Sequence, residues 1–471
     1  MSYSVIVKED CATCQLVVPV IKQLKEDDEL TIYSQDNVQF PSGVSVIDDT
    51  QLEYSWRRRI ETVPTLIKFD DNGEELARVI GWEKSEWQAL TGKPLEFDLP
   101  DFRPGCGSKS VDPGMPEKLA ARFDRDKLQS RELTISTEED DIEACFDRGW
   151  SDGLPVVPPT AERVMRMLTG TNRSPDEIVG VVPPDLVLCT IEKIAINAVL
   201  AGCKPEYLPV VIASVEAALQ DEFCMHGLLA TTYYSGPLVI VNGPLSRAIG
   251  MNSKGNALGQ GNRANATIGR ALQLVIRNIG GGKPGGVDRA VFGNPGKYTY
   301  CFAEDETNSC WESLAVEKGF SETASTVTLF AADGMQGIVD QKSRDPESLS
   351  RSFAAALRVV GHPKMILASD VILVVSPEHE RVYRLAGWTK QDVKNCLNKL
   401  LTIDGSELVA GAGGIAEGIP AKLAGKQLPK FREGGLNIVR AGGSAGMFSA
   451  IIAGWGASGT IGSVPVTREI K

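Results

Sequence analysis

Short, largely apolar runs alternate with amphipathic segments along most of this 471-residue chain. Four of the runs have the length of a strand, and they cover residues 237–243, 326–332, 365–376 and 436–443. Runs that are apolar at successive positions are typical of strands covered on both faces. Between them, apolar residues recur every three or four positions, which predicts helices. The alternation therefore predicts an α/β fold with a mostly parallel sheet in the larger part of the chain.

A stretch rich in proline and glycine divides the chain into a small and a large part. We expect a small domain over residues 1–96, a linker over residues 97–130 and a large domain over residues 131–471. Within the large domain, each of two segments has its own alternation of strands and helices. We therefore expect two lobes, 131–315 and 316–471, and two glycine-rich strand–loop–helix units suggest an old duplication.

The overall charge and the apolar patterning exclude several classes of function. The net charge is −12, whereas a nucleic-acid-binding protein needs a basic face. The first residues do not have the pattern of a signal peptide, and no apolar run has the length of a membrane span. We expect a cytoplasmic protein that binds neither nucleic acid nor membrane. Most of its ten cysteines should then be reduced and buried, with a few that are reactive, and no motif predicts a cofactor or a metal ion.

Two cysteines, Cys11 and Cys14, lie where the first predicted strand passes into the first predicted helix. A helix N-terminus lowers the pKa of a thiol, and a second cysteine one turn later can resolve a mixed disulfide. Asp10 should act in the opposite direction and raise the pKa of Cys11. A zinc site would need a second Cys-x-x-Cys, which the sequence lacks, and two inert buried thiols are the other alternative. We favour a redox-active dithiol.

The segments "DCATC" and "TVPTLIKF" resemble the corresponding segments of thioredoxin-like domains, and the resemblance covers residues 1–96. It implies a thioredoxin-like fold. It also implies that Pro64 is the cis-proline of that family, which borders the substrate site. This chain departs from the family in having Asp10, where an aromatic residue usually precedes the first cysteine.

A further cysteine, Cys106, lies between two glycines in "PGCGSK", where glycine leaves the thiol accessible. This motif resembles the UGSC family, named for a selenocysteine-Gly-Ser-Cys motif and presumed redox-active. The likeness covers residues 100–471 and extends to "FDRGWSDGLPVVPPTAERV" and "GKYTYCFAEDE". It implies that Cys106 takes the place of the selenocysteine. Lys109 replaces the family's second thiol, so Cys106 must act alone or with a more distant cysteine, and Lys109 either lowers its pKa or holds an anion.

The other cysteines and one acidic residue offer further candidates for catalysis. Cys301 is the favoured partner of Cys106, because aromatic residues flank it and Lys297 and Glu304 are near it in the sequence. Asp152, in "RGWSDGLPVVPPT", is either an acid or base, or the cap of a proline-rich turn.

Two glycine-rich loops of the large domain are candidate substrate sites. The first contains free N–H groups and leads into a helix, which predicts an anion pocket. A long surface loop with turn-forming residues is the alternative. Its candidate residues are Asn252, Asn256, Asn262, Arg263 and Asn265. The second loop contains Ser444, which we expect near the cap of a final helix over residues 444–455, as in a phosphate-type turn without the P-loop lysine.

These features together predict a thiol-dependent redox enzyme that acts on a small anionic organic substrate. Cys106 would be the nucleophile, and Cys11 and Cys14 would form a built-in reductant that a short tether keeps at high effective concentration. Thioredoxin reductase or a low-molecular-weight thiol would recharge the dithiol, and the chain could form a homo-oligomer. One alternative is a thiolate-dependent lyase or sulfur-transfer enzyme that acts on a carbon–heteroatom bond. A second alternative is a non-catalytic redox sensor.

Overall fold

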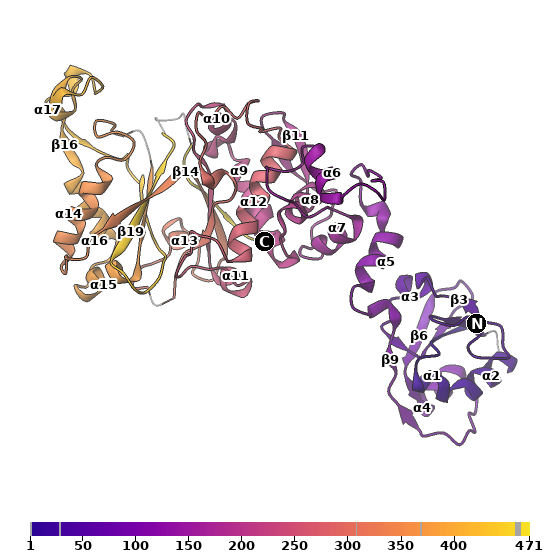
Figure 1. Cartoon of the computed structure of the whole chain (residues 1–471). Coiled ribbons are helices and arrows are strands. Elements are labelled where there is room, and N and C mark those ends of the chain that lie inside the picture. The colour runs from indigo at the N-terminus through magenta and orange to yellow at the C-terminus, as the bar shows by residue number, and fades with distance from the viewer. Residues whose placement is uncertain (1, 28–29, 308, 368–369, 457–462) are drawn as a thin grey trace. The chain divides into compact units, whose positions relative to one another are not determined.

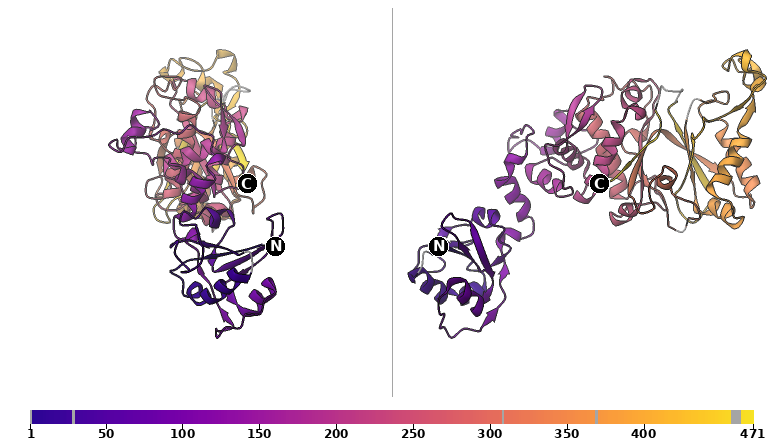
Figure 2. Two further views of the ribbon diagram at one scale, coloured as in Figure 1. Left: turned by 90° about the vertical axis from the view of Figure 1, so that its right-hand side faces the viewer. Right: turned by 180° about the vertical axis from the view of Figure 1, so that it is seen from behind.

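The computed structural model describes residues 2–27, 30–307, 309–367, 370–456 and 463–471 (Figure 1 and Figure 2). Helices and mixed sheets make it an α/β protein. The chain forms two compact units, Met1–Lys127 and Leu128–Lys471, and each is described by itself. No helix among the described residues is long and apolar enough to cross a membrane.

The first unit is built on a five-stranded sheet with the order β3-β2-β1-β5-β6. Strand β1 pairs in parallel with β2 and antiparallel with β5, which pairs antiparallel with β6. The strands are β1 (Ser2–Val7), β2 (Leu30–Ser34), β3 (Ile47–Asp48), β5 (Thr65–Phe69) and β6 (Glu75–Ile80). The helices are α1 (Ala12–Leu16), α2 (Val18–Asp27), α3 (Glu53–Arg57) and α4 (Lys84–Thr91). Trp82 and Trp87 pack edge to face in the core with ring centroids 5.3 Å apart.

The predicted linker belongs almost entirely to this first unit. Strand β8 (Phe102–Arg103) pairs with β7 (Trp82–Glu83), and β9 (Cys106–Gly107) pairs with β4 (Thr62–Val63). Helix α5 (Met115–Phe123) follows, and the unit ends at Lys127. A linker over residues 97–130 is therefore wrong, because the backbone of this segment forms two short ladders with the small domain.

The second unit contains a seven-stranded sheet with the order β13-β12-β14-β19-β15-β18, and β20 pairs with β14. Among the described strands of this sheet, the pairs β12–β13 and β15–β18 are parallel, and the other ladders are antiparallel. The predicted mostly parallel sheet is thus wrong, whereas four of its strands, β12, β14, β15 and β18, agree with the prediction. The strands are β12 (Gly236–Asn242), β13 (Cys301–Ala303), β14 (Thr326–Val339), β15 (Val371–Val375), β18 (Leu436–Arg440), β19 (Phe448–Gly454) and β20 (Val466–Glu469). Residues 368 and 369, inside the third predicted strand, lie outside the described residues.

The two halves of this sheet have the same topology. In each half, a first strand is followed by two helices, then by a parallel neighbour, and then by a strand that pairs antiparallel with the first. The second half also contains an inserted hairpin with a short helix, between Thr402 and Pro429, before its parallel neighbour. The helices are α11 (Pro244–Ala248) and α12 (Arg263–Asn278) in one half, and α15 (Pro377–Leu385) and α16 (Lys390–Leu400) in the other. Strands β14 and β19 join the halves, so one sheet runs through both predicted lobes.

The predicted final helix over residues 444–455 is wrong, because β19 occupies most of that segment. Its apolar residues follow one another without a helical period, and Ile451 and Ile452 are buried on opposite sides of the central sheet. Ser444 lies in a bend before the strand.

Further helices and two small hairpins complete the second unit. They are α6 (Asp141–Asp147), α7 (Ala161–Leu168), α8 (Ile191–Ala201), α9 (Leu208–Ala218), α10 (Met225–Ala230), α13 (Leu314–Glu317), α14 (Pro346–Leu357), α17 (Gly405–Leu408), β10 (Ile178–Val182), β11 (Val187–Thr190), β16 (Thr402–Asp404) and β17 (Gln427–Pro429). Helices α8, α9 and α12 contribute to a core against β12 and β14 (Figure 1). Helices α14, α15 and α16 contribute to a separate core against β15 and β18.

Candidate functional site: three thiols in the first unit

Cys11 and Cys14 lie at the start of the first helix, as the sequence predicts. Cys11 caps α1, and its sulfur accepts a hydrogen bond from the backbone N–H of Cys14 at 3.3 Å. Cys14 is fully buried, and Cys11 is 3% exposed. The dithiol is therefore held in a defined geometry and largely shielded from solvent.

Cys106 completes the site from the segment that was predicted to be a linker. Its Sγ lies 2.8 Å from the Sγ of Cys11, which is too long for a disulfide bond of about 2.05 Å and close enough for a thiol to donate to a thiolate. The β4–β9 ladder sets this position, because Cys106 pairs in register with Val63. The Val63–Pro64 peptide bond is cis, as the resemblance implied, so Cys106 lies opposite the residue that precedes Pro64.

Hydrogen bonding makes Cys11 the acidic thiol of the three. The pKa of Cys11 falls to about 5, chiefly because the Cys14 thiol donates to it, while burial opposes the shift and the Cys106 thiol adds to it. Burial and the bond to Cys11 raise the pKa of Cys14, and burial and the proximity of Cys11 raise that of Cys106. At neutral pH the site therefore holds one thiolate, on Cys11, and two thiols that donate to it.

Asp10 and Lys109, which the sequence predicts to influence these thiols, are not among the main influences on their pKa values. Hydrogen bonds to its sulfur lower the pKa of Cys11, and burial is the main influence that raises it. The lysine that lowers the pKa of Cys106 is Lys8, and the alternative in which Lys109 holds an anion stays a prediction. The backbone N–H of Lys109 donates to the side chain of Gln35 at 3.0 Å.

Cys301, the predicted partner of Cys106, lies in the second unit. It is buried in the core of that unit on β13, and burial raises the pKa of its thiol. The next influence on this pKa comes from another buried cysteine, Cys203. Within the first unit the sulfur that contacts Cys106 belongs to Cys11, and the pairing of Cys106 with Cys301 stays a prediction.

Asp152 has a structural partner that fits the turn-forming interpretation. Both of its carboxylate oxygens accept hydrogen bonds from Arg270, at 2.7 and 2.8 Å. Arg270 also donates to the carbonyls of Leu154 and Pro155. Burial works against the charge, but the arginine outweighs it and lowers the pKa of Asp152. The residue is an anion that fixes a turn, which argues against a role as general acid.

The predicted anion pocket is a self-bonded loop. Asn262 caps α12, and the side chain of Asn265 bonds the backbone of Asn252. The amide of Asn256 donates to the carbonyl of Gln260, and Arg263 donates to the carbonyl of Gly202, and these are contacts within the second unit. The polar groups singled out by the sequence are thus largely used to hold the loop itself.

The two glycine-rich loops nevertheless meet in the second unit. Lys254 forms an isolated bridge with Gly442, whose N–H donates to the carbonyl of Ser253 at 2.9 Å. The loop of Ser444 therefore begins at a contact with the asparagine loop.

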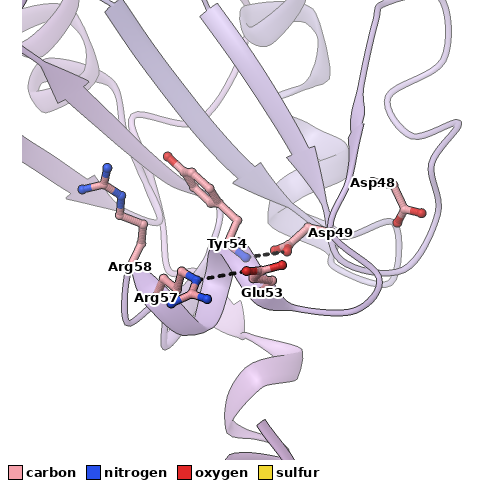
Figure 3. A pocket seen from close by; sticks show the side chains of 6 residues that line it. All are labelled: Asp48, Asp49, Glu53, Tyr54, Arg57 and Arg58. Atoms are coloured by element: carbon pink, nitrogen blue, oxygen red, sulfur yellow. Dashed lines mark hydrogen bonds and ion pairs between the residues drawn. The ribbon is translucent and has the colours of Figure 1, made fainter. Parts of the chain in front are cut away.

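An open hollow of about 500 Å³ lies elsewhere in the first unit (Figure 3). It is lined by Asp48, Asp49, Glu53, Tyr54, Arg57 and Arg58. Figure 3 shows two of its contacts, an ion pair between Arg57 and Glu53 at 3.0 Å and a hydrogen bond from the Tyr54 N–H to Asp49. No predicted site residue lines this hollow. Among the described residues, no group of histidine, cysteine, aspartate and glutamate side chains is arranged to hold a metal ion.

Sequence reasoning missed Gln35 and Ser108, which fix the position of Cys106. The Nε2 of Gln35 donates to the Oγ of Ser108 at 2.7 Å, and both residues are buried. The signal for Ser108 is its position directly after the "CG" of the motif, whereas the sequence around Gln35 does not indicate its role.

No protein-family model matches this chain, and no curated protein matches it. The geometry of the three thiols is therefore the strongest basis for inferring the chemistry.

Proposed function

We propose that the chain is a thiol-dependent redox enzyme. Cys106 would react with a small organic substrate, and Cys11 and Cys14 would return Cys106 to its thiol form. The contact of 2.8 Å between the sulfurs of Cys11 and Cys106 carries this proposal. The strand order around β1 and the cis peptide before Pro64 support a thioredoxin-like character for the first unit.

The proposed reaction reduces the substrate by two electrons. The Cys106 thiol first passes its proton to the Cys11 thiolate, whose sulfur lies 2.8 Å away. The Cys106 thiolate then attacks the electrophilic atom of the substrate, forms a sulfur–substrate bond and expels a leaving group, which takes the proton from Cys11. The Cys11 thiolate restored in this way attacks the sulfur of Cys106. The electron pair of the sulfur–substrate bond leaves with the substrate, which is protonated, and a Cys11–Cys106 disulfide forms.

Cys14 then regenerates Cys106. Once deprotonated, the Cys14 sulfur attacks Cys11 and releases Cys106 as a thiolate, and a Cys11–Cys14 disulfide remains. Burial and the bond to the Cys11 thiolate keep Cys14 protonated in the reduced enzyme, and this bond is lost once Cys11 is oxidised. An external dithiol, such as that of a thioredoxin reductase, or a low-molecular-weight thiol completes the cycle by reducing the Cys11–Cys14 disulfide.

The C14S variant tests this order of events. Without Cys14 the cycle should stop at the second disulfide, so one equivalent of oxidant should convert most of the protein to the Cys11–Cys106 form. Peptide mass spectrometry without reductant identifies the linked peptides. The C14S/C106S double variant is the matched control and should leave Cys11 unlinked. If Cys11 of C14S becomes linked to the oxidant and no Cys11–Cys106 peptide forms, the proposed function is wrong.

A further inference from the structure

The segment that carries Cys106 is attached to the first unit as an added strand. Strands β9 and β8 pair with β4 and β7, and within the described residues neither β4 nor β7 pairs with any other strand. The hydroxyl of Thr13, next to the dithiol, donates to the carbonyl of Pro104 at 2.6 Å. An extended peptide from another protein that docked beside the dithiol would use such backbone groups. The chain's own segment already occupies them.

Two glycines allow this segment to lie very close to the unit. A Cβ at Gly105 would lie 2.4 Å from Cγ2 of Thr62 and 2.8 Å from the carbonyl oxygen of Val63. A Cβ at Gly81 would lie 2.9 Å from the nitrogen of Gly105. Contacts below 3.0 Å require the backbone to shift, so this packing leaves no space for a second chain between the segment and β4.

A buried hydrogen-bond network holds the segment from its other end. Gln35 donates to Ser55 and to Ser108, each at 2.7 Å. Ser108 is 2.7 Å from Ser110, whose hydroxyl donates to the carbonyl of Ile60. These hydroxyls are all buried, so removal of one partner leaves another polar group unsatisfied. Release of the segment would therefore be costly.

The three sulfurs differ in how they meet the solvent. Cys11 and Cys14 are buried, whereas Cys106 is half-buried. A Cβ built at Gly107, beside Cys106, would meet no atom within 4 Å, so this flank of the segment is open. The outer thiol can therefore meet a small molecule while the dithiol is covered.

We propose that the segment over residues 102–111 permanently occupies the backbone of β4 and β7, where an extended peptide from another protein would otherwise bind. Electrons then leave the dithiol only through Cys106. The outside substrate is then a small disulfide or comparable electrophile, and extended protein disulfides are excluded. This inference rests on the proposed function and adds the class of substrate. A tethered strand has an effective concentration in the millimolar range, which a protein substrate at micromolar concentration cannot match.

The test compares two disulfides as substrates for the full-length chain with dithiothreitol as the final reductant. Oxidised glutathione represents small molecules, and insulin represents protein disulfides. Wild type should reduce oxidised glutathione and act only weakly on insulin. The G105A variant should displace the segment and raise the rate on insulin by roughly tenfold, because the open form becomes more populated. The matched G107A variant should keep the low wild-type rate on insulin.

Hydrogen exchange of residues 102–111 checks that G105A has displaced the segment and that the rest of the unit remains folded. Q35A provides a second, milder displacement if G105A does not fold. Equal rates on insulin for wild type and a displaced variant would overturn the inference. This outcome is distinguishable from failure of the proposed function, which is the absence of a Cys11–Cys106 disulfide in C14S. An insulin rate that rises on displacement remains informative whether or not that disulfide forms.

Discussion

The cysteines of the two units differ in their surroundings more than in their exposure. In the first unit, Cys11, Cys14 and Cys106 are joined by hydrogen bonds, and one of them has a lowered pKa. In the second unit, every cysteine with a clear shift has a raised pKa, with burial as the largest cause. These are Cys145, Cys189, Cys203, Cys301 and Cys310.

This difference shows what keeps a buried thiol ionised. Burial alone favours the neutral thiol, and it does so for Cys301 and Cys203. Cys11 is just as enclosed, but two thiols and the backbone N–H groups of Thr13 and Cys14 donate to its sulfur. The stabilised thiolate is therefore a property of the group of residues, and cysteine content alone does not predict it.

The largest expected effect is the contrast between C106S and C301S. C106S should lower turnover of a small disulfide on the order of a thousandfold, because the proposed nucleophile is lost. C301S should leave turnover at the wild-type rate, because Cys301 is enclosed in the core of the second unit. Steady-state rates with oxidised glutathione measure both. Normal turnover in C106S, or loss of turnover in a folded C301S, would remove the distinction between the two units.

The next effect concerns the pKa of Cys11, which is about 5 in wild type. C14A should raise this pKa more than C106A does, because the Cys14 thiol makes the larger contribution. The difference in thiolate ultraviolet absorbance between each variant and its C11S counterpart, followed against pH, gives the values. A larger shift in C106A would mean that Cys106 is the main donor to the thiolate.

The same pKa gives a sign for the effect of pH on stability. The folded-state pKa of Cys11 lies below its unfolded value, so ionisation of Cys11 stabilises the reduced unit. This contribution is complete above the unfolded pKa of about 8.5 and is lost as the pH falls through about 5. The stability advantage of wild type over C11S should therefore shrink over that interval.

Local sequence patterns predicted the elements of this chain well. The Cys11–Cys14 spacing at a strand–helix junction and the cis peptide before Pro64 were both expected, and both are present. Four buried strands of the second unit, β12, β14, β15 and β18, were also expected. These features depend on residues close together in the chain, where spacing and side-chain type carry the information.

Long-range pairing accounts for most of what the sequence did not predict. A buried apolar strand has the same sequence pattern whether its neighbours are parallel or antiparallel, so the pattern did not predict the mixed sheet. The Pro/Gly-rich composition of residues 97–130 indicates a linker, whereas pairing of Cys106 with Val63 depends on residues far apart in the sequence. The hydrogen bond between Asn252 and Asn265 was also not predicted. These two residues belong to one loop, and their spacing fits a ligand site equally well.

A smaller effect is expected from the buried network that holds the Cys106 segment. S108A should lower the stability of the first unit by roughly 1–2 kcal/mol, because it removes one buried hydrogen-bond partner of Gln35 and one of Ser110. S85A, at an exposed site, should change stability by less than about 0.5 kcal/mol. Chemical denaturation of the first unit, followed by its two buried tryptophans, measures both. Equal effects would show that the network does not fix the segment.

The smallest effect on redox chemistry is expected from D152N. The carboxylate of Asp152 is bonded at both oxygens by Arg270, so the amide should weaken this contact and destabilise the second unit by about 1 kcal/mol. Turnover of oxidised glutathione should not change, because the three thiols belong to the first unit. In the wild type, Asp152 is an anion at neutral pH and has no proton to donate. R270A should also destabilise the second unit and leave turnover unchanged. A fall in turnover for D152N at unchanged stability would instead assign Asp152 a chemical role, and would mean that the second unit takes part in the reaction through a group other than its cysteines.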